Sequence, residues 1–196
     1  MRLLAVLHNT NWKTNMQFNS TILILPGLGN SGEGHWQTKW QNRFGFERVG
    51  QANWDEPVCD DWIACIDAAV VKHGITNVIL VAHSLANTTV AAWAKKYNRA
   101  IKAALLVAPS DTEAESYPHG TTGFMPMALN KLPFPSTVVA SENDFYVTLA
   151  RATYFADCWG SRLVTIGNVG HINVASGHGD WEEGLPLLKE LDMLHQ

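Results

Sequence analysis

Ser84 is the residue whose surroundings best fit those of a catalytic nucleophile. It lies in the stretch VAHSLAN, where an apolar run ends and a helical pattern begins at once. A sharp strand-to-helix turn of this kind projects a serine hydroxyl from the edge of a sheet and requires small neighbours. Ala82 and Ala86 are such neighbours, in place of the more usual glycines. The alternative is that Ser84 only caps the helix, since serine is a favoured N-cap residue.

A serine nucleophile needs a general base, and the base needs a carboxylate that orients it. At strand-to-helix serine turns, the order along the chain is Ser, then Asp or Glu, then His. Asp144 follows the predicted strand at residues 137–140, and His171 follows the one at 163–166. Asp111 also follows a strand and is a second candidate for the acid. We favour Asp144 because its strand is expected to lie beside the strand that precedes His171.

Other acidic and imidazole side chains are weaker candidates because of their positions. Glu142 lies closer to its strand end, where it is expected to face solvent or cap a turn. His119 and His178 do not directly follow a strand. His83 is adjacent to the serine, and adjacent residues on a sharp turn point apart, so it is expected to pack locally. Position relative to the strands therefore decides among the histidines.

Acyl transfer also needs two hydrogen-bond donors aimed at the oxyanion that forms on the carbonyl oxygen. The backbone N–H of Leu85, directly after the serine, is the expected first donor. The second is expected from the glycine-rich stretch LPGLGNSGEGHW, which follows the first strand. Leu28 is our choice because it follows the Pro-Gly turn, while Gly29 and Asn30 remain alternatives.

The same stretch has a rival interpretation as a nucleotide site. G-L-G-N-S-G has the G-x-G-x-x-G spacing of a loop that binds dinucleotide phosphates. However, no acidic residue ends the second apolar strand, where a ribose hydroxyl would be held, and the chain has no G-K-[ST] motif. Nucleotide binding therefore stays open as the less favoured interpretation.

Short apolar runs alternate with helical patterns along the chain. The runs lack strict alternation, as in strands covered on both faces, and they predict strands at residues 21–25, 78–82, 103–107, 137–140 and 163–166, with a weaker one at 46–49. Helices are predicted at about 35–44, 59–73, 85–97, 147–158 and 181–194. This alternation predicts an α/β fold, a three-layer α/β/α sandwich with a mostly parallel sheet. Its active site is expected at the carboxyl ends of the strands.

The composition indicates one soluble domain. The chain has 196 residues, of which 46% are hydrophobic and 16% charged, enough for a single core. A net charge of −4 without a run of Lys or Arg disfavours nucleic acid and anionic membranes as partners. Residues 1–20 are predicted to be a weakly structured extension, and residues 21–196 the domain. Three cysteines without C-x-x-C spacing, and no recognisable signal peptide or spanning run, predict a cytoplasmic protein.

The long connection at residues 109–135 is expected to form a wall of the site. Within it, Phe124 and Met125 are candidates for an apolar acyl pocket, and Trp54 is a candidate for the edge of the cleft. The sequence contains no metal-ligand cluster, so neither a metal nor a cofactor is expected. It does not indicate an oligomeric state.

Four stretches of the sequence resemble the retinoblastoma-binding-protein-nine-like family of small serine hydrolases, which has bacterial members. The resemblance covers residues 21–194 and rests on LPGLGNSGEGHWQTKW, WDEPVCDDW, VAHSLAN and GHINVASGHGDWEEGLPLL. It implies a compact α/β-hydrolase fold without a separate cap domain. It also implies Ser84 as nucleophile, Asp144 as acid and His171 as base, in an esterase that acts on short acyl chains.

The expected reaction is therefore hydrolysis of a small-molecule ester in two steps, through an acyl-enzyme. An amidase or peptidase would use the same residues. A protein-binding module on a hydrolase scaffold would retain them without turnover, because a fold does not determine a function.

Overall fold

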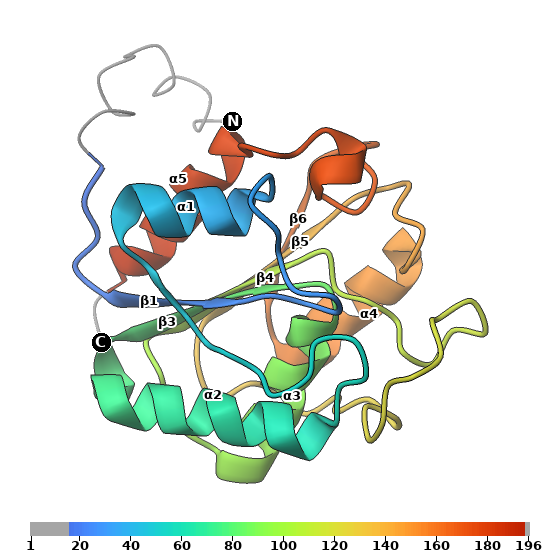
Figure 1. Cartoon of the computed structure of the whole chain (residues 1–196), viewed down its shortest axis with the longest axis horizontal. Coiled ribbons are helices and arrows are strands. Elements are labelled where there is room, and N and C mark those ends of the chain that lie inside the picture. Colours follow the sequence, from blue (N-terminus) through green and yellow to red (C-terminus); the bar gives the residue numbers. More distant parts are fainter. Residues whose placement is uncertain (1–15, 195–196) are drawn as a thin grey trace.

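The computed structural model describes residues 16–194 and contains a six-stranded sheet in the order β2-β1-β3-β4-β5-β6 (Figure 1). Every pair of neighbouring strands is parallel. The predicted strands are confirmed, and their ends shift by at most one residue: β1 (Thr21–Leu25), β2 (Glu47–Arg48), β3 (Val78–His83), β4 (Ala103–Val107), β5 (Ser136–Ala140) and β6 (Arg162–Thr165).

Helices cover both faces of this sheet (Figure 1). One face carries α1 (Trp36–Phe44) and α5 (Leu185–Asp192), and the other carries α2 (Cys59–His73), α3 (Leu85–Tyr97) and α4 (Leu149–Trp159). The arrangement is the predicted three-layer α/β/α sandwich, and it is a compact α/β-hydrolase fold.

Alternate strand residues point into two separate hydrophobic cores. Leu80 and Leu106 pack on the α2–α4 side, whereas Ile79 and Leu105 pack on the α1–α5 side. Because both of their faces are buried, the central strands β3 and β4 are nearly continuous apolar runs, as the sequence showed, whereas the edge strands β2 and β6 carry charged residues.

The predicted helix at residues 181–194 is divided into two parts. A short 3-10 turn, η4 (Glu182–Gly184), precedes α5. Pro186 lies in the first turn of α5, where the fixed φ of proline favours a helix start, and this explains why the α-helix begins there. Two other 3-10 turns are η2 (Ile75–Asn77) and η3 (Val174–Ser176).

Residues 16–20 have no helix or strand, but the protein holds them in place. The carboxylate of Asp192, on α5, accepts the N–H groups of Asn19 and Ser20 at 3.1 and 2.9 Å. Phe18 packs edge-on against Phe46. Residues 1–15 lie outside the described residues, so a domain that begins at residue 21 stays a prediction.

The order of the strands in the sheet places the carboxyl end of β1 where an active-site crevice is expected. β1 lies between β2 and β3, so the connections after β1 and β2 lead to opposite sides of β1. In open α/β sheets a crevice forms at the carboxyl ends of such strands. The glycine-rich loop after β1 and the turn after β3 meet there. In the described part of the chain, no helix is both long and apolar enough to cross a membrane.

We expect Asp192→Ala to lower the free energy of unfolding by about 3 kcal/mol, because it leaves two backbone donors and the Lys189 ammonium without their carboxylate. Urea denaturation measures this. Asp157→Ala, at an exposed position on α4, is the matched control and should change stability by less than about 0.5 kcal/mol. Equal stabilities of the two variants would contradict the anchoring role of Asp192.

Candidate active site

Ser84 lies on a strained turn between β3 and α3. Its backbone has φ 58° and ψ −126°, in the positive-φ region that non-glycine residues rarely adopt. The Ser84 N–H donates to the carbonyl of Val107, and the side-chain amide of Asn87 donates to the carbonyls of both Ser84 and Val107. Ser84 is the N-cap residue of α3 by position, but its side chain makes no capping bond, so capping does not account for its hydroxyl.

The turn directs the Ser84 hydroxyl toward His171. The Ser84 Oγ lies 2.9 Å from His171 Nε2, and His171 Nδ1 lies 2.8 Å from Asp144 Oδ2. A carboxylate only accepts hydrogen bonds, so His171 donates from Nδ1, and in the neutral ring Nε2 is then the acceptor for the Ser84 hydroxyl. The Asp144 side chain is fully buried and the His171 side chain is 8% exposed. This arrangement can move a proton from the serine to the imidazole.

The loops after β5 and β6 hold Asp144 and His171 in this relation. Ser141 Oγ accepts the Val169 N–H at 3.0 Å, and Asn143 Oδ1 accepts the Gly170 N–H at 2.7 Å. Asp144 Oδ1 also accepts the N–H of Tyr146 within its own loop. Side chains of one loop therefore fix the backbone of the other just before His171.

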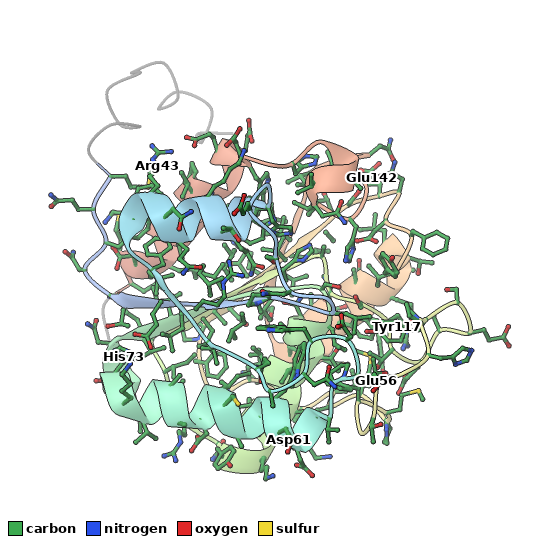
Figure 2. All side chains as sticks on the ribbon, in the orientation of Figure 1. Arg43, Glu56, Asp61, His73, Tyr117 and Glu142 are labelled. Carbon is green, nitrogen blue, oxygen red and sulfur yellow. The ribbon has the colours of Figure 1, made fainter. Side chains whose placement is uncertain are left out.

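The competing carboxylate and imidazole groups are engaged elsewhere or lie apart. Asp111 forms an ion pair with Arg151, with Oδ2 2.7 Å from Nε, and has no contact with His171 among the described residues. Glu142 is exposed at the edge of the molecule (Figure 2). His178 bonds within its own loop, and His119 is exposed.

Two of the three candidates for the second oxyanion donor are already used. The Gly29 N–H donates to the carbonyl of Trp54 at 2.8 Å, and the Asn30 N–H donates to the carbonyl of Gly27 at 3.1 Å. Within residues 16–194, no acceptor takes the N–H of Leu28 or of Leu85. Both backbone donors therefore remain free beside the serine turn.

Close packing against the serine turn explains why residue 27, at the start of the loop, is a glycine. A Cβ at this position would lie 2.8 Å from Ser84 Cβ and 2.9 Å from the carbonyl oxygen of His83. The G-x-G-x-x-G segment ends at Gly32, before His35, the N-cap of α1, so its N–H groups do not lie at a helix N-terminus. The arrangement differs from that of a phosphate-binding glycine loop.

A cavity of about 180 Å³ opens beside Ser84. Its wall includes Tyr117 and Pro118 from the long connection, together with Tyr146 (Tyr117 is labelled in Figure 2). The connection thus lines the cavity as predicted, but through residues that the sequence did not single out. A larger, shallower hollow of about 830 Å³ lies near η4 and contains neither Ser84 nor His171.

Trp54, Phe124 and Met125 do not line this cavity, which corrects the pocket prediction. Phe124 is buried in the core against Trp62, and the Trp54 ring packs on Trp62 as well. Met125 is 65% exposed. Apolar character alone could not distinguish a core residue from a wall residue in this irregular segment.

Ser110 is a site residue that the sequence analysis missed. Its hydroxyl lies 2.9 Å from Ser84 Oγ, and the residue is 1% exposed. Because Ser84 donates its own proton to His171, Ser110 is the donor in this contact. The only signal was its position, three residues after the end of β4.

Three imidazole rings lie in a row beside the cavity. His83 contacts His35 on one side and His171 on the other, with ring centroids 4.9 Å apart in both pairs. His83 Nε2 donates to the carbonyl of His171 at 2.9 Å, and burial holds its pKa well below the ordinary value. Burial, the Arg48 guanidinium and His171 lower the pKa of His35 to about 4. His35 and His83 are therefore neutral at neutral pH.

The fold and this site define an α/β-hydrolase with a serine at its strand-to-helix turn. The model of the serine hydrolase family matches residues 22–190, and the chain belongs to that family. A comparison with curated protein sequences found no match. No group of three His, Cys, Asp or Glu side chains that could hold a metal ion occurs among the described residues.

Solved structures show the same fold. A YdeN-like hydrolase from Pectobacterium atrosepticum is 31% identical, with a TM-score of 0.76 over 88% of this chain and 90% of that one. The ydeN gene product of B. subtilis is 19% identical, with a TM-score of 0.69 over 87% and 97%. Est1E from Butyrivibrio proteoclasticus, solved with ferulic acid bound, is 16% identical, with a TM-score of 0.61 over 90% and 92%.

We expect Gly27→Ala to lower the free energy of unfolding by about 1–3 kcal/mol, because the new Cβ collides with the serine turn. Gly32→Ala is the matched control. Its Cβ would meet no atom within 4 Å, so it should leave stability unchanged within about 0.5 kcal/mol. Thermal and urea denaturation measure both variants, and an equally stable Gly27→Ala protein would refute the close packing of loop and turn.

Acid should destabilise the protein partly through His35. The folded protein binds a proton at His35 more weakly than the unfolded chain does, so stability falls as the pH drops from about 6.5 toward 4. Between pH 7 and pH 5 this group should contribute a loss of about 2 kcal/mol. His35→Asn should show a correspondingly smaller loss in urea denaturation at the two pH values. Parallel losses in both proteins would show that His35 titrates normally.

Proposed function

We propose that this serine hydrolase is a carboxylesterase that uses Ser84, His171 and Asp144 as its catalytic triad. The observation that carries the proposal is the continuous chain of contacts from Ser84 Oγ through His171 to the buried Asp144, at 2.9 and 2.8 Å. A nucleophile, a base and an orienting carboxylate in this order have the geometry that acyl transfer requires. Asp144 is favoured as the acid because Asp111 is paired with Arg151.

In the first step, Ser84 Oγ attacks the ester carbonyl while its proton passes to His171 Nε2. The negative charge that develops on the carbonyl oxygen is stabilised by the free N–H groups of Leu28 and Leu85. The leaving alcohol then takes the proton from Nε2 as the tetrahedral intermediate collapses. Water, deprotonated by His171, hydrolyses the acyl-enzyme and regenerates the Ser84 hydroxyl.

The cavity limits the size of the substrate. A volume of about 180 Å³ is smaller than the roughly 300–1,000 Å³ of most ligand sites, which favours a short acyl group. Among the solved structures of similar fold, one is named esterase 2 of Thermogutta terrifontis. This name concerns ester bonds and supports esters over amides for this chain.

The proposed location is the cytoplasm. Cys59, Cys65 and Cys158 are all free in the structure, which fits a reducing compartment.

We expect a fluorophosphonate to give a single adduct on Ser84, seen as one added mass in the intact protein. Ser84→Ala should give none, and His171→Ala should slow labelling and reduce turnover of p-nitrophenyl butyrate by at least about 10³-fold, because the base is lost. His178→Ala is the control, since His178 has no contact with Ser84 in the described structure.

The outcomes separate the alternatives. A folded wild-type protein without any adduct would refute the nucleophile and favour a binding module. Labelling of Ser84 with turnover of amides but not of esters would instead identify an amidase or peptidase with the same triad.

A further inference from the structure

We propose that His35 selects the acyl group of the substrate, by donating a hydrogen bond from its Nε2–H to an oxygen atom within the acyl chain. The preferred substrates are then short esters whose acyl part carries an acceptor oxygen beyond the ester group itself. This inference rests on the proposed function, because it names the substrate class of the same site.

The tautomer of His35 is fixed by the helix that follows it. His35 is the N-cap of α1, and its Nδ1 accepts the N–H of Gln37 at 3.2 Å. With the lone pair of Nδ1 engaged, the proton of the neutral ring lies on Nε2. Since its pKa is lowered to about 4, the ring stays neutral at neutral pH. Nε2–H is therefore a donor, and never an acceptor, under those conditions.

This donor has no partner within the protein. His35 is 7% exposed, and it lines the same cavity as Ser84 and His171. Among the described residues, no hydrogen bond uses its Nε2. Nε2 is not one of the fully buried side-chain atoms that lack a partner, so this donor is accessible from the cavity. A ligand that displaces water from such a donor loses affinity unless it supplies an acceptor of its own.

The position of His35 assigns it to the acyl part of the substrate. The leaving group has to lie against His171 Nε2, which protonates it. The His83 ring contacts the rings of both His35 and His171, and no ring contact joins His35 to His171 directly in the described residues. The His83 ring thus separates His35 from the ring that protonates the leaving group, which favours the acyl part as the partner of His35. The oxyanion already has the backbone donors of Leu28 and Leu85.

The positive charge of Arg48, which acts on His35, favours an oxygen over an ammonium group at this point. The Arg48 guanidinium donates to Asn30 Oδ1, to the Ser31 carbonyl and to Thr38 Oγ1, all of them neutral acceptors. No carboxylate pairs with it in the part of the chain that the structure describes. Its positive charge is close enough to lower the pKa of His35. A negatively polarised substrate oxygen is therefore stabilised beside His35, and a cation is disfavoured.

Two variants separate the hydrogen bond to substrate from the structural role of the residue. In His35→Asn, the side-chain oxygen can still cap α1, because Asn is a favoured N-cap residue, but its amide does not reach as far as the imidazole Nε2. In His35→Gln, the amide nitrogen reaches about as far as Nε2, while the short capping acceptor is lost. Both variants remove the ring, so the loss of ring packing is matched.

The substrates are three p-nitrophenyl esters with acyl chains of the same length: the pentanoate, the ethoxyacetate and the 3-methoxypropionate. The two ether esters each replace one methylene by an acceptor oxygen. For each enzyme, kcat/KM for an ether ester is divided by the value for the pentanoate. The ratio is corrected by the rates of hydroxide-catalysed hydrolysis, because an ether oxygen also changes the intrinsic reactivity.

We expect the wild type to prefer at least one ether ester by about five- to tenfold, as one hydrogen bond to a neutral acceptor allows. His35→Gln should retain most of this preference, and His35→Asn should lose it. If His35 only caps α1, the ratio should be the same in the wild type and in both variants. No preference in the wild type, or the same preference in His35→Asn, would overturn the proposal.

Fluorophosphonate labelling of all three proteins separates this proposal from the proposed function. If Ser84 is labelled in each and the ratios do not differ, only the assignment of His35 fails. If Ser84 of the folded wild type is not labelled at all, the proposed function fails first.

Discussion

The site depends on a backbone turn that an ordinary residue adopts only under constraint. Ser84 has a φ of 58°, a conformation that costs a non-glycine residue about 1–3 kcal/mol. The carbonyl of Val107 and the side-chain amide of Asn87 hold the turn from β4 and α3, and Gly27 leaves room for it from the loop after β1. The turn is therefore stabilised by the same strands that form the centre of the sheet. In return it raises the hydroxyl toward His171 and leaves the N–H of Leu85 free.

Three neighbouring imidazoles have different hydrogen-bond partners, and this gives each a different chemistry. His35 accepts a backbone N–H at Nδ1, and His83 donates to a backbone carbonyl. His171 alone faces a carboxylate, at 2.8 Å. Of the three rings, His171 is the one within hydrogen-bond distance of Ser84 Oγ, at 2.9 Å. Burial opposes a charge on His35 and His83, so these two rings do not compete for a proton released by Ser84.

The strands and the meeting of Ser84, Asp144 and His171 could be predicted from the sequence, for one physical reason. Strands buried on both faces are continuous apolar runs, and parallel strands bring the residues after them to one edge. The cavity wall could not be predicted in this way. Tyr117 and Pro118 come from an irregular connection without periodicity, where buried Phe124 has the same apolar character. The contact of Ser110 with Ser84 depends on side-chain packing across two strand ends, which no local pattern encodes.

The glycine-rich stretch shows why spacing alone did not separate a phosphate loop from an oxyanion loop. Both bring backbone N–H groups to a negative oxygen, but a phosphate needs several free donors at a helix N-terminus. Here the N–H groups of Gly29, Asn30 and Ser31 are used within the protein, and among these loop residues Leu28 keeps a free one. The space left by the missing Cβ of Gly27 is filled by Ser84 and not by a ligand. The free N–H groups of Leu28 and Leu85 on either side of the serine turn suit a single developing oxyanion, which supports the proposed acyl transfer over nucleotide binding.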